Sequence, residues 1–197
     1  MCAAAASPLA EGETECESPL LLGCVEGNRE AWRSLHVQYY PVTIAFLRKL
    51  GIRELDLEDA AQEVFLQMHR YLPRFRGNAE LKTWLYRLCI TQARILRRRR
   101  RVSDALRSLF SLSPESMNLS SPGFCEQSAR RRVQAALDCL SEPERIAVVL
   151  YDMEGLPGKQ VAEISRCKEG TLWRRLHYAR KKFVEALEAS APTEEPT

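Results

Sequence analysis

The stretch from Thr83 to Arg101, TWLYRLCITQARILRRRRR, carries the clearest pattern in this chain, because an amphipathic helix runs in it without a break into five consecutive arginines. With Asn78 as the expected N-cap, apolar side chains recur every three or four positions, as on one face of a helix. That face consists of Leu81, Trp84, Leu85, Leu88, Cys89 and Leu96, interrupted only by Gln92. The spacing predicts a helix that buries one side.

The other side of this helix is basic. Its positions include Lys82, Arg87, Arg94 and Arg97. We expect Trp84 and Tyr86 near this exposed side. A solvated basic face beside a core aromatic residue is one explanation, but five adjacent arginines repel one another and are seldom placed together unless a polyanion lies opposite. The stretch therefore favours contact with nucleic acid.

Composition leaves room for one large domain or two small ones in the 197 residues, with 45% hydrophobic and 28% charged residues. The net charge is only +3, yet many of the 29 Lys and Arg residues crowd into 87–107, 130–132 and 168–182. Such clusters suit two separate contacts with a polyanion. No apolar run is long enough to span a bilayer and no secretory signal is recognisable, so we expect a cytoplasmic chain without membrane insertion.

The seven cysteines are scattered, without a C-x-x-C pair or a histidine at ligand spacing, so we expect reduced thiols and no metal site. Cys89 and Cys139 fall on predicted core faces. Only three histidines occur, and no nucleophile, base or glycine-rich phosphate loop stands in a recognisable arrangement. The sequence therefore predicts a binding protein with no catalytic residues and no cofactor, rather than an enzyme.

The first domain is expected over residues 18–103, after a disordered tail at 1–17 that is rich in Ala, Glu, Ser and Pro. Apolar periodicity predicts a short helix and then a longer one that tolerates Pro41 and ends at Gly51. A further helix before Pro73 has a core face formed by Leu57, Ala60, Ala61, Val64, Phe65, Met68 and Leu72.

The outer face of that further helix is acidic and polar. It carries Asp56, Asp59, Gln62, Glu63 and Gln67 on neighbouring rows. Solvated acids at a helix start are one explanation, because carboxylates there also favour the helix macrodipole. A metal-dependent nuclease or recombinase using Asp56, Asp59 and Glu63 is a rival explanation, although no histidine or second acidic cluster completes a ligand shell.

The second domain is expected over residues 129–188, between a linker at 104–128 and a tail at 189–197. The linker is dense in Ser and Pro and has no sustained period, which predicts a flexible connection. The fold class is therefore all-α, with two small helical domains joined by a flexible linker. Within the second domain, Ser141 to Glu144 form a capping box, and the helix that they open should continue to Gly155.

The end of the second domain describes a helix-turn-helix: a short helix over 159–165, a break, and a basic helix from Thr171. In such a module the first turns of the second helix enter the major groove, where an arginine can bond guanine through two donors. Thr171, Arg174 and Arg175 are then candidates for base contact. Lys181 and Lys182 are candidates for phosphate contact. A generic exposed helix is the alternative.

Five motifs occur together in this chain: D-x-x-Q-E-V-F, F-R-G, T-W-L-Y-R, V-A-E-I and G-T-L-x-x-R-L. Through them, residues 18–188 resemble the two conserved domains of bacterial RNA polymerase sigma factors, specifically the small extracytoplasmic-function (ECF) type of the sigma-70 family. The resemblance implies a factor that directs core polymerase to specific promoters and assists promoter melting without catalysing a reaction. It also implies an anti-sigma factor as a partner.

The resemblance assigns roles to three sets of residues. Polymerase binding falls to Asp59, Gln62 and Glu63. Contact with the minus-ten promoter element falls to Lys82, Trp84, Tyr86, Arg87, Thr91, Arg94, Arg97, Arg98, Arg99, Arg100 and Arg101. Contact with the minus-thirty-five element falls to Lys168, Thr171, Trp173, Arg174, Arg175, Tyr178, Lys181 and Lys182.

Two departures from the family pattern stand on the last helix. The usual V-K-S-R-L-x-R-A has Arg174 in place of serine and Tyr178 in place of its second arginine, so we expect a different promoter preference. A free-standing helix-turn-helix regulator is the remaining rival, but it leaves the acidic helix and the T-W-L-Y-R motif unexplained.

Overall fold

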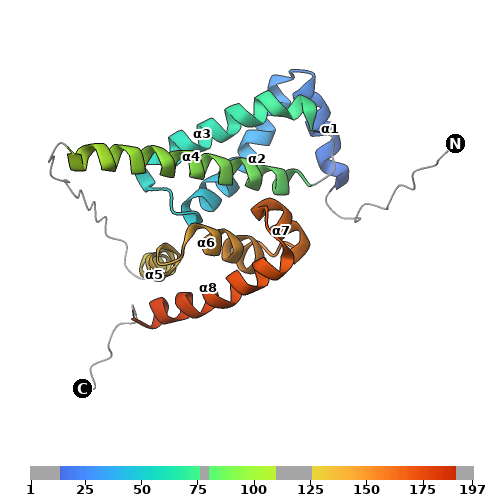
Figure 1. Ribbon diagram of the computed structural model, residues 1–197. Coiled ribbons are helices and arrows are strands. Elements are labelled where there is room, and N and C mark those ends of the chain that lie inside the picture. Colours follow the sequence, from blue (N-terminus) through green and yellow to red (C-terminus); the bar gives the residue numbers. More distant parts are fainter. Residues whose placement is uncertain (1–13, 76–79, 110–125, 190–197) are drawn as a thin grey trace.

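The computed structural model describes residues 14–75, 80–109 and 126–189. Within these ranges all regular structure is helical, which confirms the all-α fold class. Helices α1 to α4 form one group and α5 to α8 form a second group beside it (Figure 1). Most of the predicted tails and linker, and the predicted cap Asn78, lie outside the described residues.

The first group consists of α1 (Thr14–Val25), α2 (Arg29–Lys49), α3 (Glu54–Tyr71), the 3-10 turn η1 (Leu72–Arg74) and α4 (Leu81–Leu109). Helix α1 begins inside the predicted tail, which the sequence placed as far as residue 17. Asn28 caps the start of helix α2, since its Oδ1 accepts the backbone N–H of Glu30 at 2.9 Å, and the helix continues through Pro41 as expected. Gly51, with φ +82°, closes it.

The core of this group follows the predicted stripes closely. Leu57, Ala60, Ala61, Val64 and Met68 of α3 are buried, and Phe65 is half-buried. On α4 the buried residues include Leu81, Leu85, Cys89 and Gln92. The amide of Gln92 lies 3.4 Å from that of Gln67, so the polar interruption of the stripe has a hydrogen-bond partner.

Helix α4 continues past the predicted start of the linker at 104 and ends at Leu109, and the next helix, α5, already begins at Glu126. The segment 104–109, which contains a single serine, is helical because it extends an existing helix, which requires no new nucleation. No helix within the described ranges is long and apolar enough to cross a membrane.

The second group consists of α5 (Glu126–Asp138), α6 (Glu142–Val148), the π-helical turn η2 (Val149–Met153), α7 (Gly158–Ser165) and α8 (Glu169–Ala189). The capping box is confirmed, because Glu144 Oε2 accepts the backbone N–H of Ser141 at 3.0 Å. The helix predicted to run unchanged to Gly155 instead widens into the π turn. Arg166, with φ 53°, makes the left-handed turn between α7 and α8.

Cys139 does not lie on a core face as predicted, because it is exposed. Helix α5 ends at Asp138, so the helical period that placed Cys139 inward stops one residue before it. Cys89 is buried as expected, and burial raises the pKa of its thiol.

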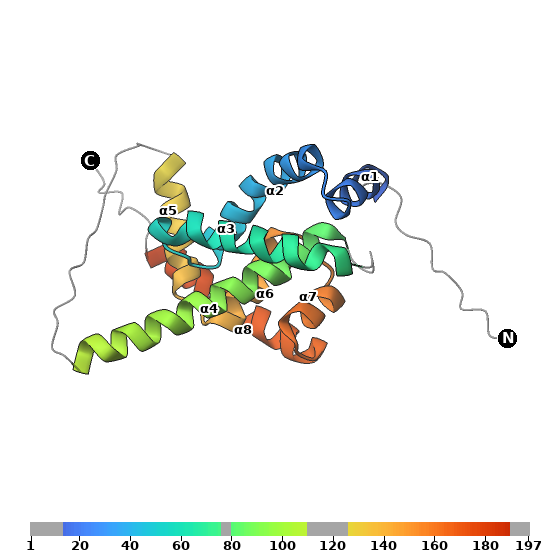
Figure 2. The ribbon, with the colours of Figure 1, turned by 90° about the horizontal axis from the view of Figure 1, so that it is seen from above.

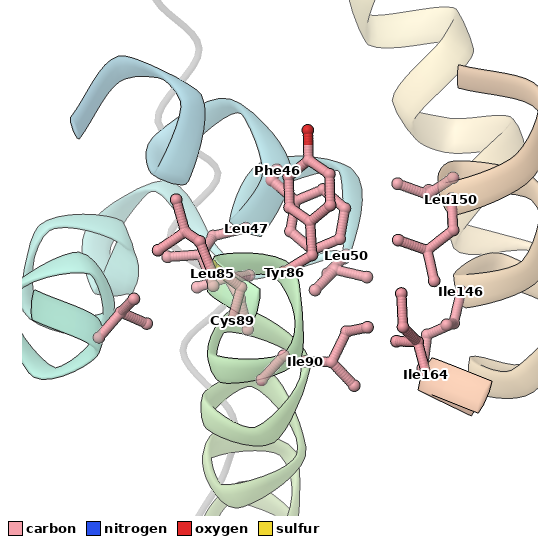
Figure 3. Close-up of a cluster of buried hydrophobic side chains, with 14 of the residues drawn as sticks. Phe46, Leu47, Leu50, Leu85, Tyr86, Cys89, Ile90, Ile146, Leu150 and Ile164 are labelled. Atoms are coloured by element: carbon pink, nitrogen blue, oxygen red, sulfur yellow. The ribbon is translucent and has the colours of Figure 1, made fainter. Parts of the chain in front are cut away.

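The two groups share one apolar cluster. Figure 3 shows Leu50 and Ile90 of the first group facing Ile146 and Leu150 of the second, and all four side chains are buried. Figure 2 shows α4 passing over α6 and α8. Helices pack closely along one another inside each group, and buried side chains of both groups belong to one hydrophobic cluster.

Candidate nucleic-acid interface

Helix α4 presents the predicted basic surface. Lys82, Arg87, Thr91, Arg94, Arg98, Arg99 and Arg101 are exposed, and Arg97 and Arg100 are half-buried. Arg100 binds the Asp56 carboxylate of α3, which also accepts Arg53 Nε at 2.9 Å. The pKa of Asp56 is lowered because the hydrogen bonds from Arg53 outweigh the effect of burial, and the contact with Arg100 lowers it further.

Tyr86 is fully buried, so its expected place near the exposed side of α4 is wrong in this arrangement. Its ring stacks on Phe46, with centroids 4.1 Å apart, and its hydroxyl donates to the Glu154 carboxylate from the second group. Burial and the adjacent carboxylate both raise the pKa of Tyr86, which keeps the phenol protonated. A buried phenol needs a hydrogen-bond partner, and Glu154 supplies it.

Trp84 is half-buried, and its ring packs against Phe75 at 5.2 Å between centroids. It remains the partly accessible aromatic platform of α4. The sequence placed Trp84 both in the apolar stripe and near the exposed side, and its partial burial agrees with both placements.

Glu142, at the start of α6, holds two of the α4 arginines. Its carboxylate accepts Arg94 Nε at 2.9 Å and lies 3.3 Å from Arg97 Nη1. Burial raises the pKa of Glu142, but the two guanidinium groups outweigh burial and leave the pKa below its usual value. Arg97 also donates to the backbone carbonyl of Leu50.

The residues predicted for polymerase binding, Asp59, Gln62 and Glu63, are all exposed on α3, but they line two different hollows. Asp59 and Glu63 line a depression of about 320 Å³ together with Arg99 of α4. Gln62 lines a groove of about 940 Å³ between α2 and α3, beside Phe65. The acidic surface of α3 and the basic surface of α4 are therefore contiguous.

The acidic surface of α3 does not form a metal site. Among the residues that the structure describes, no group of three or more His, Cys, Asp or Glu side chains is arranged to hold a metal ion. Asp56, one of the three carboxylates of the nuclease hypothesis, is instead paired with Arg53 and Arg100. The geometry therefore gives that hypothesis no support.

Helix α8 follows α7 as the second helix of the predicted helix-turn-helix. Lys168, Trp173, Arg174, Tyr178, Lys181 and Lys182 are exposed, and Thr171 and Arg175 are half-buried. The Trp173 ring meets Tyr151 edge-on, with centroids 5.2 Å apart, and lies against Gly158, where a side chain would collide with it. Trp173 therefore fixes α7 on α8 while 45% of its surface stays exposed.

Three cations of α8 are paired inside their own domain, among them Lys181, whose Nζ lies 4.0 Å from Glu185 Oε1. Lys182 Nζ lies 2.7 Å from Glu144 Oε1, and Arg180 contacts Asp152 through two hydrogen bonds of 2.6 and 3.2 Å. The acceptor Asp152 lies in the π turn, which was not predicted. The accessible cations near the start of α8 are therefore Arg174 and, just before the helix, Lys168, with Arg175 partly accessible beside them. Lys181 is exposed further along α8.

Sequence reasoning missed the residues that join the two domains, chiefly Lys49, Glu142, Arg145 and Glu154. Arg145 is buried and donates to the Leu50 carbonyl at 3.1 Å. The only sign of this role in the sequence was that Arg145 is a charged residue next to the apolar run of α6. Glu154 had no signal, because its partners Lys49 and Tyr86 lie 105 and 68 residues away along the chain.

Two family models match this chain: sigma-70 region 2 over residues 35–104 and sigma-70 region 4 over residues 130–183. The first covers most of α2 to α4, and the second covers most of α5 to α8. Each matched segment lies within one of the two helical groups, and α1 lies outside the first match.

Curated relatives match most of the chain. The ECF RNA polymerase sigma-E factor of Escherichia coli K12 is 28% identical over 165 residues, which cover 79% of this chain and 86% of that protein. The RNA polymerase sigma-H factor of Pseudomonas aeruginosa is 27% identical over 171 residues, which cover 82% and 89%.

Solved structures share the fold. CnrH in complex with the cytosolic domain of CnrY superposes with a TM-score of 0.63 at 20% identity, covering 88% of this chain and 97% of that one. The sigma factor RpoE of Bartonella quintana, in complex with the anti-sigma factor NepR, superposes with a TM-score of 0.63 at 21% identity, covering 81% and 98%. From the two regional matches, the relatives and the fold together, the chain belongs to the sigma-70 family and is a sigma factor of the ECF type.

Proposed function

We propose that this chain binds RNA polymerase core and directs it to specific promoters, where it assists strand separation and catalyses no reaction itself. The observation that carries the proposal is the presence, in one chain, of a basic helix with a partly exposed aromatic platform and a helix-turn-helix with an exposed basic face. The curated relatives are named RNA polymerase sigma factors, which supports the same function here.

The α4 surface is proposed to hold the minus-ten element as single strand. Trp84 offers a face on which an unpaired base can stack, which is worth about 1 to 3 kcal/mol per base. The exposed guanidinium groups of Arg98, Arg99 and Arg101 are suited to the phosphates of the same strand. Separated bases can thus be held without any chemistry on the DNA.

The α8 surface is proposed to read the minus-thirty-five element as duplex. Arg174 and Arg175 lie in the first turns of α8, the part of a recognition helix that enters the major groove. Lys181, two turns further on, is placed for a phosphate rather than a base. Base contacts would then specify the sequence, and phosphate contacts would fix the register.

The exposed side of α3 is proposed to dock on the polymerase through Asp59, Gln62 and Glu63. An anti-sigma factor is the further partner that we propose, since the solved structure of RpoE with NepR is a complex of that kind. We place the chain in the cytoplasm, where its polymerase works.

Promoter-dependent transcription with purified components tests the function. Holoenzyme reconstituted from this chain and bacterial core polymerase is used to select promoters from a genomic library, and the selected templates are transcribed in a run-off assay. We expect transcripts that start at one position per template and that need both the chain and the core. Duplex binding by the chain alone, with no transcript when core is added, would overturn the proposal in favour of a free-standing regulator.

A further inference from the structure

Trp173 of α8 is a large apolar side chain that stays partly in solvent. It directly follows the buried Leu172, so it lies beside the core stripe of α8 rather than on it, and 45% of its surface is exposed. Single exposed apolar side chains are ordinary on protein surfaces. Trp173 differs from them because two other elements of the domain fix the place of its ring.

The π turn η2 supports the indole ring through Tyr151. The two rings meet edge-on, at 86° between their planes and 5.2 Å between their centroids. Arg180, about two turns after Trp173 on the same side of α8, lies 5.7 Å from the centroid of the Tyr151 ring. Arg180 also makes two hydrogen bonds to Asp152. Tyr151 therefore contacts two positions of α8, and the pair of Arg180 with Asp152 holds the turn that carries it.

Gly158, the first residue of α7, supports the ring from the second element. A Cβ atom at this position would lie 2.8 Å from Cζ2 and 3.0 Å from Cη2 of Trp173, closer than two carbon atoms in van der Waals contact. Glycine therefore lets the six-membered end of the indole lie against the start of α7. Since the ring is fixed in the free chain, little side-chain freedom is lost when it meets a ligand.

The surroundings of the ring are basic. Arg174 follows Trp173 directly and is exposed, Arg175 is half-buried, and the exposed Lys168 directly precedes α8. Such cations attract the phosphates of DNA, and the first turns of a recognition helix are the part that enters the major groove. The anchored indole therefore lies in the part of α8 that meets the bases under the proposed function.

The chemistry of the major groove favours one base opposite an indole. Guanine, cytosine and adenine present hydrogen-bond donors and acceptors there, whereas thymine also presents a methyl group at C5. An indole has one donor, Nε1–H, and the rest of its ring is apolar. Ring carbons packed against donors or acceptors separate those groups from water without giving them a partner, which is unfavourable. Ring carbons packed against a methyl group remove apolar surface from water on both sides, which is favourable.

We propose that Trp173 is a specificity-determining residue of this sigma factor, which reads a thymine of the upstream promoter element by packing its indole ring against the 5-methyl group. Gly158 and Tyr151 are the residues that position the ring. The proposal rests on the proposed function for the placement of α8 in the major groove. It adds an apolar contact to the hydrogen bonds assigned to Arg174 and Arg175.

Replacement of thymine by uracil tests this contact, because uracil lacks the 5-methyl group and keeps every hydrogen-bonding group. Each thymine in the upstream element of a promoter selected with the holoenzyme is replaced in turn. The affinity of reconstituted holoenzyme for each duplex is measured by competition against the unmodified, fluorescein-labelled duplex. The scan is repeated with Trp173→Ala and with Gly158→Ala, which should displace the ring. Gly170→Ala is the matched control, because the same added methyl group meets no atom within 4 Å.

We expect wild-type holoenzyme to bind about fourfold less tightly when one particular thymine becomes uracil, as for the loss of one buried methyl group. Trp173→Ala should bind both duplexes equally, Gly158→Ala should lose most of the difference, and Gly170→Ala should keep it. A scan with no sensitive thymine, or a selected upstream element without thymine, would overturn the proposal. A fourfold difference that persists in Trp173→Ala would also overturn it, because another side chain would then meet the methyl group.

Gly158→Ala keeps the test decisive if Trp173→Ala does not fold, because it retains the indole and adds only one methyl group. A full thymine–uracil difference in this variant would contradict the positioning of the ring by α7. A failure of the proposed function is distinguishable, since it shows as an absence of promoter-dependent transcripts from unmodified templates. A failure of this inference leaves those transcripts intact and removes only the difference between thymine and uracil.

Discussion

Gly51→Ala places a methyl group between the two domains, where it overlaps the guanidinium of Arg145. The substitution has two separate costs. At φ +82° an alanine is in the left-handed region, which costs about 1 to 2 kcal/mol. The methyl group also displaces Arg145 from the Leu50 carbonyl, and a hydrogen bond from a charged donor contributes about 1.5 to 3 kcal/mol.

Gly27→Ala separates these costs. Gly27 has φ +80°, nearly the same as Gly51, but an added Cβ there meets no atom within 4 Å. This control therefore carries the backbone cost alone. Because the clash at Gly51 lies between domains, separation of the two domains relieves it. The additional cost should therefore appear in the equilibrium between packed and separated domains rather than in the unfolding of either domain.

Urea unfolding followed by far-UV circular dichroism, together with small-angle scattering, measures both parts. We expect the two variants to lose similar free energy of unfolding, about 1 to 2 kcal/mol. Only Gly51→Ala should shift the equilibrium from packed toward separated domains, by about ten- to a hundredfold for the lost hydrogen bond. A Gly51→Ala chain as compact as the Gly27→Ala chain would refute the placement of Arg145 against the α2–α3 turn.

Three further outcomes are expected. Burial raises the pKa of Glu154, but hydrogen bonds from Lys49 and Tyr86 outweigh burial and leave the pKa below the ordinary 4.5, so the contact between the domains is stabilised above pH 4.5 and lost as the pH falls through the lowered value. Small-angle scattering should therefore show expansion of the chain at low pH, and expansion only at higher pH would contradict the sign. Asp59→Ala with Glu63→Ala should weaken binding to core polymerase, measured by surface plasmon resonance, without changing the fold or the binding of duplex DNA by α8. Unchanged affinity for core would show that these carboxylates do not contact the polymerase. Arg175→Ala should cost about 1 to 3 kcal/mol at the selected upstream element and little elsewhere, whereas Lys181→Ala should weaken binding evenly and reduce the salt slope by about one. Equal losses on all sequences in a filter-binding assay would contradict the two roles.

Local order was predictable from the sequence because it depends on neighbours a few residues apart. The capping box at Ser141 links residues three apart, and the core face of α3 repeats every three to four positions, so both are recorded in the order of residues. The basic surface of α4 was predictable for the same reason. The length of α4 was underestimated, because residues 104–109 were grouped with the Ser- and Pro-rich stretch that follows them, whereas they extend an existing helix at no cost of nucleation.

Tertiary structure decided the contacts that join the two domains. Tyr86 was expected near the exposed side of α4, yet its hydroxyl meets Glu154, which is 68 residues away along the chain. The Leu50 carbonyl meets Arg145 over 95 residues. Helical periodicity reports only which side of a helix faces an apolar core. Which domain covers the other side, and which charge lies opposite, depends on how two separately folded units pack, and that information is not contained in local spacing.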